Sequence, residues 1–332
     1  MELSPDIQAN GDEMREEYDL NALSNAVRGK YAHRTKGNSG YEQTSSTNGA
    51  MNDAKNEFLK RVHREMVPIL EQSVVPILRY QGDEAHAHGT GTLFRIANKS
   101  FLITASHVVE DEKHDFAIPD FPSGLINLHG ELHGNRIRDF AIWDLPSGVV
   151  DRLSHYRFLS VHQADRKNER PKKGVYMTSG YPCELTVSNV DELGTKKMRM
   201  RPLTQLAAIY AGDTSHISNY DPNDISNYDP KMHLLLGTPK REAQMLIEGE
   251  VALPHRVNGM SGCSIWQVYY EGLSTKHWTP QDAVIVAIQT GVYSLYSKGD
   301  VTKGTRWCVV DEFLRERFPE LRGPLSLVLS RA

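Results

Sequence analysis

The sequence has few cysteines, no long hydrophobic run and no excess of basic charge. Its 332 residues include 3 cysteines (Cys183, Cys263 and Cys308), and this odd, widely spaced set predicts neither a disulfide framework nor a zinc site. No stretch approaches the ~18 apolar residues of a membrane span, and the first residues lack the apolar core of a signal peptide. A formal net charge of -4 argues against nucleic acid or an anionic membrane as the main partner. We therefore expect a cytoplasmic protein, and no motif in the chain predicts a metal or other cofactor.

Composition divides the chain into a polar N-terminal segment and a body that can form a core. Hydrophobic residues make up 39% and aromatic residues 8% of the chain. Residues 1–50 are low in apolar side chains and rich in turn formers, which predicts a disordered tail. A tail that is simply solvated and a tail that docks on a regulatory partner both remain open.

A helix is predicted over residues 51–72, directly after this tail. Its apolar residues recur at helical spacing, and they are Phe58, Val62, Met66 and Ile69. Pro68 is expected to end or kink the helix, because proline lacks the amide hydrogen that the helix needs.

The body of the chain, residues 73–325, is rich in short strands. Alternating segments such as 89–96 and 100–104 are bounded by turn residues, and helices are scarce until a short amphipathic helix at 311–318. Many short strands with almost no interior helices predict an all-β barrel or sandwich.

One segment of this body has the character of an insertion. Residues 217–222 are repeated as 225–230, and both copies contain asparagine, aspartate and proline, which favour turns. We expect a surface insertion over about 210–245, either a tolerated expansion or a loop that contacts substrate.

The stretch Gly259-Met260-Ser261-Gly262 has the chemistry of a nucleophile turn. A nucleophilic serine needs an exposed hydroxyl and backbone amides that point at a developing oxyanion. Glycine tolerates the dihedral angles that direct such amides inward, so the amides of Gly259 and Ser261 could hold the oxyanion. Taken alone, the same residues also fit a tight turn before a strand.

A histidine and an aspartate upstream could complete the site. His107 follows a short strand, where a turn can present its ring. Asp139 stands at the head of an apolar strand, placed to be buried and to accept a hydrogen bond from a histidine. Asp144 competes for this role, but an odd spacing of five puts it on the opposite face of the strand.

These segments together resemble the trypsin-like (chymotrypsin-fold) serine peptidases. The motifs are G-T-G-T-L-F, I-T-A-S-H-V-V, D-F-A-I-W-D-L and N-G-M-S-G-C-S-I, in the order His, Asp, Ser. The likeness is to the bacterial intracellular and Deg-like branch, with TAxHV in place of TAAHC. It implies two six-stranded antiparallel β-barrels, here with an N-terminal helix and a short C-terminal helix.

The resemblance also implies roles for individual residues. Ser261 would attack the scissile carbonyl, His107 would act as base and acid, and Asp139 would orient the imidazole. The substrate-binding wall would contain His255, Gln289, Thr290 and Gly291. No acidic residue stands in this wall, which disfavours a pocket for lysine or arginine.

Two positions depart from the family pattern. Met260 replaces the aspartate that pairs with a freed N-terminal amine in secreted members, so activation by that ion pair is not expected here. Cys263 lies two residues past Ser261 and is expected to be a buried structural thiol rather than a nucleophile. The sequence thus predicts a serine endopeptidase acting on proteins or peptides; the alternative is a catalytically silent trypsin-fold protein that binds a peptide or partner.

Overall fold

The computed structural model describes most of the chain beyond the predicted tail. The described residues are 46–81, 84–110, 115–120, 124–169, 173–190, 196–211, 228–238, 257–294 and 300–327. Residues 1–45 of the predicted tail, most of the predicted insertion at 210–245 and the expected subsite residue His255 lie outside these ranges.

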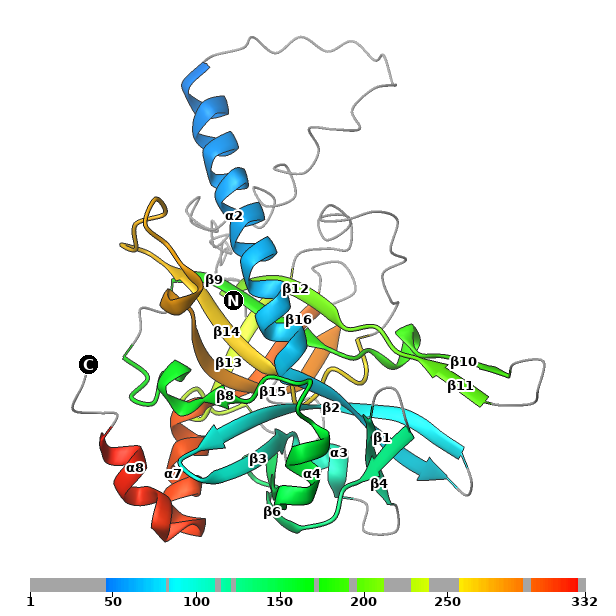
Figure 1. Ribbon diagram of the computed structural model, residues 1–332. Helices are drawn as coiled ribbons and strands as arrows, with labels where there is room; N and C mark the ends of the chain where they lie inside the picture. The colour runs from blue at the N-terminus through cyan, green and yellow to red at the C-terminus, as the bar shows by residue number, and fades with distance from the viewer. Residues whose placement is uncertain are drawn as a thin grey trace, which may run out of the picture.

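The described residues form mainly β-structure with five α-helices (Figure 1). The helices are α2 (Ser46–Ser73), α3 (Ser106–Val109), α4 (Ser147–Arg152), α7 (Trp307–Arg317) and α8 (Arg322–Leu327). The strands of the first half are β1 (Val74–Gln81), β2 (Glu84–Ile96), β3 (Lys99–Thr104), β4 (Phe116–Asp120), β5 (Gly124–Asn127), β6 (Glu131–Asn135), β7 (Phe140–Asp144) and β8 (Leu159–Ser160). Those of the second half are β9 (Gly174–Gly180), β10 (Val187–Val190), β11 (Lys196–Arg199), β12 (Leu203–Ile209), β13 (His233–Thr238), β14 (Ser264–Tyr270), β15 (Val284–Ser294) and β16 (Asp300–Arg306).

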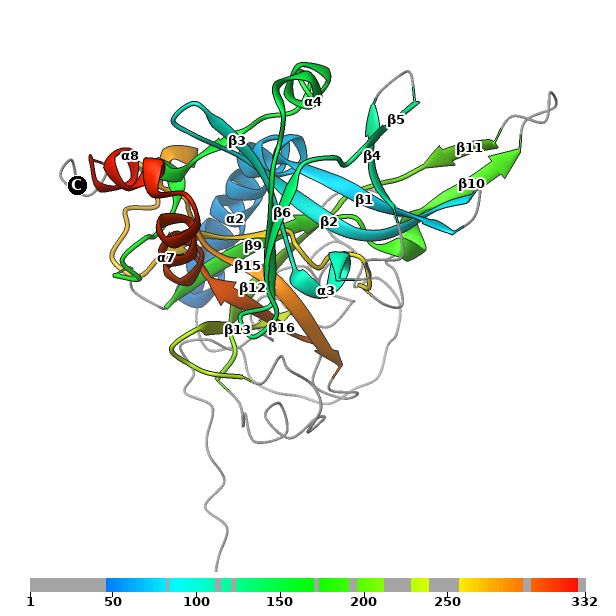
Figure 2. The same ribbon diagram turned by 90° about the horizontal axis from the view of Figure 1, so that it is seen from below.

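The second half of the chain forms a closed six-stranded barrel. Its strand order is β12-β13-β16-β15-β14-β9, and every pair is antiparallel. The hairpin formed by β10 and β11 projects away from both sheets in the two views (Figure 1, Figure 2). This part agrees with the expected barrel.

The first half of the chain differs from the expected second barrel. Its sheet has 8 strands in the order β5-β4-β1-β2-β3-β7-β6, with β8 added in parallel to β2. In the described part of the chain the sheet stays open, because the short end strands β5 and β6 pair only with β4 and β7. The expectation of two closed, fully antiparallel barrels is therefore corrected to one barrel and one open sheet.

Helix α2 is longer than predicted and continues through Pro68 to Ser73. Pro68 is exposed, so water can solvate the carbonyl group that loses its helical hydrogen bond. The predicted apolar stripe is present, since Val62 and Met66 are completely buried and Phe58 is 9% exposed. At the end of the stripe, Leu70 replaces the expected Ile69 as the buried residue.

One hydrophobic cluster joins the two halves of the chain. It contains side chains of the open sheet such as Phe94 and Phe140, side chains of the barrel such as Trp266 and Ile285, and the buried faces of α2 and α7. The two halves therefore cannot separate without exposing this cluster to water.

In the described residues, no helix is long and apolar enough to cross a membrane.

Candidate functional site

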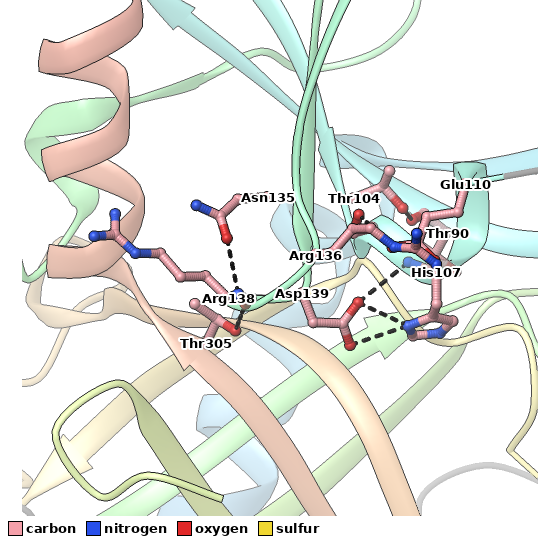
Figure 3. Close-up of polar contacts among 10 residues, drawn as sticks. Thr90, Thr104, His107, Glu110, Asn135, Arg136, Arg138, Asp139 and Thr305 are labelled. Atoms are coloured by element: carbon pink, nitrogen blue, oxygen red, sulfur yellow. Dashed lines mark hydrogen bonds and ion pairs between the residues drawn. The ribbon is translucent and has the colours of Figure 1, made fainter. Parts of the chain in front are cut away.

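Asp139 lies directly against His107 (Figure 3). Both carboxylate oxygens of Asp139 are 3.0 Å from His107 Nδ1, and Oδ1 also accepts the backbone amide of His107 at 3.1 Å. When Nδ1 donates to the carboxylate, the neutral ring carries its free lone pair on Nε2. The Asp139 side chain is 6% exposed and that of His107 is 48% exposed, so the imidazole ring is open to solvent while its carboxylate partner is shielded.

Opposing effects act on the pKa of His107. Burial favours the neutral ring and lowers the pKa, whereas the hydrogen bond and the negative charge of Asp139 raise it. The positive charge of Lys303 also lowers the pKa, and Glu110 raises it slightly. Together these effects place the pKa of His107 above its ordinary value.

The loop between β6 and β7 directs Asp139 at the histidine. The amide of Asp139 donates to the carbonyl of Arg136 at 3.2 Å, and the amide of Arg138 donates to Asn135 Oδ1 at 2.9 Å, so the loop is a tight turn. Asp139 has a φ of 50°, in the left-handed region that aspartate tolerates better than most residues. Strand β7 begins at the next residue, which confirms that Asp139 stands buried at the head of an apolar strand.

Asp144 lies away from the histidine. It is at the other end of β7, where its carboxylate binds the ammonium group of Lys99. The sequence therefore selected the aspartate that contacts His107, although Asp139 lies in the turn before β7 and not on a face of the strand.

The turn that carries Ser261 is attached to the strands that lead to His107. The carbonyl of Ser261 accepts the amide of Thr90 at 2.9 Å, and Thr104 Oγ1 donates to the carbonyl of Thr90 at 2.7 Å. Gly262 sits so close to these strands that a Cβ there would overlap the carbonyl of Thr90. Because His107 follows Thr104 by three residues, the serine turn and the histidine belong to one region of the molecule.

No hydrogen bond joins the Ser261 hydroxyl to the His107 ring within the described residues. Such contacts are often long in an enzyme without substrate. Of the contacts expected for the predicted triad, the described residues thus contain the one between Asp139 and His107 and not the one between Ser261 and His107.

Around Ser261, some backbone amides are already bonded and others are not. The amides of Met260, Gly262 and Cys263 donate to backbone carbonyls at 3.2, 2.8 and 3.1 Å. Among the residues that the structure places, the amides of Gly259 and Ser261 donate to none. These are the two amides that the sequence suggested for an oxyanion hole.

The peptide plane before Gly259 is held in one orientation. The carbonyl of Asn258 accepts the amide of Cys183 at 2.7 Å. In a trans peptide the C=O and N–H groups point in opposite directions, so the Gly259 amide points away from Cys183. Gly259 has a φ of 97°, and a Cβ there would lie 2.6 Å from the carbonyl oxygen of Tyr181. Only glycine fits this position.

The buried side chains of Met260 and Cys263 anchor the turn that carries Ser261 to the core. Both are completely buried, in a cluster with Val74 and Leu203. The Cys263 thiol donates to Gln289 Oε1 at 3.3 Å, and burial raises its pKa well above the ordinary value. Cys263 is therefore a structural thiol, as the sequence predicted.

Three of the four residues predicted to line the substrate wall, Gln289, Thr290 and Gly291, lie in the described part of the chain. Gln289 and Thr290 are 1% and 2% exposed, and the Gln289 amide group faces Cys263 rather than solvent. Gly291 is partly exposed on β15. Among the predicted wall residues that the structure describes, Gly291 is thus accessible to a ligand, whereas the side chains of Gln289 and Thr290 are buried.

Sequence reasoning did not assign Thr90, Thr305 or Lys303 to the site. Thr90 belongs to the G-T-G-T motif, which was a usable signal. Thr305 Oγ1 supports the Asp139 turn by donating to the carbonyl of Arg138 at 2.6 Å (Figure 3). Neither Thr305 nor Lys303 carries a local signal, because their contacts depend on the packing of β16.

Within the described ranges, no group of three or more His, Cys, Asp or Glu residues is arranged to hold a metal ion.

Comparison with known proteins returned solved structures alone. No protein-family model matches the chain, and no curated protein matches its sequence. The chain is similar to the thermostable serine protease AL20 from an extremophilic microorganism, with 13% identity and a TM-score of 0.38 over 71% of this chain and 91% of that chain. It is also similar to a structure concerning the intrinsically disordered VPg protein of Sesbania mosaic virus, with 15% identity and a TM-score of 0.36 over 74% and 89% of the two chains. Neither similarity points to the Deg-like branch.

Proposed function

We propose that the chain is a serine endopeptidase with Ser261 as nucleophile, His107 as general base and acid, and Asp139 as the residue that orients His107. The observation that carries this proposal is the buried Asp139 carboxylate at 3.0 Å from His107 Nδ1. A carboxylate in this place fixes the tautomer in which Nε2 accepts a proton, and it stabilises the imidazolium that forms.

The proposed reaction proceeds through an acyl-enzyme. Ser261 Oγ attacks the scissile carbonyl carbon while its proton moves to His107 Nε2. The negative charge that develops on the carbonyl oxygen is stabilised by the amides of Gly259 and Ser261. His107 then gives its proton to the leaving amine. A water molecule next attacks the acyl carbon while its proton moves to His107, the bond between the acyl carbon and Ser261 Oγ breaks, and the proton passes from His107 to Oγ as the acid product leaves.

Met260 bears on how this proposed site is assembled. An ion pair with a freed N-terminal amine would need an aspartate at position 260. The chain instead has a buried methionine there, packed against Val74 and Leu203. Apolar packing needs no cleavage to form, so the nucleophile turn would be in place without release of a new N-terminus.

Covalent labelling tests the proposal directly. A fluorophosphonate probe should label the full chain at Ser261, and both Ser261→Ala and His107→Ala should abolish labelling and peptide cleavage. The double variant should lose little more activity than either single variant, because the residues act as one unit. Cleavage of an unfolded protein by purified Ser261→Ala at the wild-type rate would refute the triad. Absence of labelling in a folded wild-type chain would favour the silent, partner-binding alternative.

A further inference from the structure

Thr90 on β2 is completely buried, and all of its polar atoms are hydrogen-bonded. Its hydroxyl donates to the carbonyl of Gly259 at 2.7 Å and accepts the amide of Tyr181 at 2.9 Å. Its backbone amide donates to the carbonyl of Ser261 at 2.9 Å. Its own carbonyl accepts Thr104 Oγ1 at 2.7 Å (Figure 3). Both hydrogens that Thr90 can donate therefore go to the turn that carries Ser261.

The partners of the Thr90 hydroxyl fix the direction of its hydrogen. The amide of Tyr181 can only donate, so it occupies a lone pair of Thr90 Oγ1 and leaves the hydroxyl hydrogen for the carbonyl of Gly259. A Cβ on Gly180 would lie 3.1 Å from the same oxygen, so the end of β9 packs closely against it. The hydroxyl thus joins β2 and the end of β9 to the serine turn.

The place of Thr90 on β2 makes its backbone available to this turn. The pairing of β2 with β3 begins at Thr92, so Thr90 lies beyond it. On the other side, Thr90 is opposite Pro76 of β1, and proline has no amide hydrogen to donate to the carbonyl of Thr90. That carbonyl instead accepts the Thr104 hydroxyl. The sequence therefore leaves Thr90 free of the regular ladder at the point where β2 meets the serine turn.

The two carbonyls that Thr90 binds belong to the residues whose amides form the proposed oxyanion hole, Gly259 and Ser261. The peptide plane before Gly259 is held by the bond from the Cys183 amide to the carbonyl of Asn258. The plane after Gly259 contains the carbonyl that accepts the Thr90 hydroxyl. Gly259 is thus fixed on both sides at its φ of 97°, although a glycine by itself has access to many other conformations.

We propose that Thr90 is a positioning residue for the candidate nucleophile turn: its hydroxyl and amide hold the carbonyls of Gly259 and Ser261, and thereby keep the amides of these two residues turned toward the oxyanion. Donors that are already oriented need no reorganisation when the negative charge develops. The catalytic meaning of this inference rests on the proposed function, whereas the hold of Thr90 on the turn does not.

Substitution of Thr90 in the full chain tests the proposal by kinetics. Thr90→Val keeps the branched shape but removes the hydroxyl, so the plane after Gly259 loses its donor. We expect kcat for a peptide substrate to fall about 10- to 100-fold, with KM changed less than about threefold. Thr90→Ser keeps the hydroxyl and should restore most of kcat. A loss of packing alone would leave Thr90→Ser, which lacks the methyl group, no better than Thr90→Val.

NMR tests the hold on the turn without reference to activity. Gly259-Met260 is the one Gly-Met pair in the sequence. A chain labelled at the carbonyl carbon of glycine and at the nitrogen of methionine therefore gives a single correlation signal from this peptide plane. In Thr90→Val the carbonyl signal should move upfield, the direction for a carbonyl that loses a hydrogen bond. In Thr90→Ser it should stay near its wild-type position.

Thr92→Val is the matched control. Thr92 is two residues away on β2 and completely buried, and its hydroxyl donates to the carbonyl of Gly262 at 3.1 Å. The amide of Gly262 already donates to the carbonyl of Gln289, so Gly262 is not among the proposed oxyanion donors. Thr92→Val should lower the urea midpoint about as much as Thr90→Val, with a much smaller loss of kcat and an unmoved Gly259 signal. If Thr90→Val does not fold, Thr90→Ala takes its place in each comparison.

An unmoved Gly259 carbonyl signal in a folded Thr90→Val would overturn the proposal. Equal losses of kcat in Thr90→Val and Thr92→Val would also overturn it, since any buried donor to the turn would then act alike. A wild-type chain that cleaves no peptide would refute the proposed function, while the shift of the Gly259 signal in Thr90→Val would still support the hold of Thr90 on the turn.

Discussion

The proposed oxyanion hole depends on the direction of a single peptide plane, the one before Gly259. In Gly259→Ala, the new Cβ would meet the carbonyl of Tyr181 at 2.6 Å, at a φ of 97° that alanine disfavours. The plane must then rotate and withdraw the Gly259 amide. We expect kcat to fall about 100- to 1,000-fold, with a much smaller change in KM, measured by steady-state kinetics on a peptide substrate.

Gly272 provides a matched control for this substitution. It has the same φ of 97°, but a Cβ there would meet nothing within 4 Å. Gly272→Ala should therefore carry the backbone strain without the loss of kcat. Equal losses in the two variants would show that strain, and not the oxyanion hole, explains the effect.

His233 is expected to make the fold sensitive to acid. Burial, and then the charge of Lys303, lower its pKa to about 4 in the folded chain against an ordinary value of 6.5, so between these values the unfolded chain binds a proton that the folded chain does not. The free energy of unfolding should fall by up to about 3 kcal/mol as pH decreases through this window. Urea unfolding of wild type and His233→Gln at pH 7 and pH 4.5 measures this, and the variant should lose that part of the decrease. Parallel pH dependences would contradict the assignment.

At the scale of elements, the sequence predicted what depends on local patterns. The helical stripe of α2, the strand before His107 and the strand that begins after Asp139 all follow from residue spacing within one segment. The open edge of the first sheet did not follow, because closure depends on pairing between distant strands. Whether Pro68 would end or kink the predicted helix was also left open, since the continuation of α2 to Ser73 depends on which face of the helix meets solvent. Lys303 had no local signal at all.

Helix α2 is part of the core rather than an appendage, and this gives a prediction at the element scale. Met66 is completely buried in the cluster that includes Trp266 and Phe94. Met66→Ala should lower the free energy of unfolding by about 2–5 kcal/mol in urea denaturation. Lys60→Ala removes an exposed ion pair with Glu57 on the same helix and should change it by less than about 0.5 kcal/mol. Similar small effects would mean that the helix is not docked.

At the scale of the whole molecule, the candidate triad depends on both halves of the chain. His107 lies on α3 and Asp139 in the turn before β7, both in the half of the chain that forms the open sheet, and Ser261 precedes β14 of the barrel. The segment between the halves is held to the barrel, because the amide of Asp165 donates to the carbonyl of Ile285 at 2.8 Å. The shared hydrophobic cluster then makes the relative position of His107 and Ser261 a property of the whole fold.

A buried ion pair attaches the same connecting segment to the C-terminal helix α7. Arg166 Nε donates to Asp311 Oδ1 at 2.6 Å, and Arg315 Nε donates to Asp311 Oδ2 at 2.8 Å. The Arg166 side chain is 3% exposed, so neutralising its partner leaves a charge in the core.

Asp311→Asn should therefore lower the free energy of unfolding by about 3 kcal/mol, with unfolding still in one cooperative transition. Glu312→Gln, on the same helix but at a position whose side chain is 60% exposed and pairs with Arg138, should change it by less than about 0.5 kcal/mol. Calorimetry measures both variants. Two separate transitions in Asp311→Asn would show that the halves fold independently, and an unchanged stability would show that the buried pair does not hold them together.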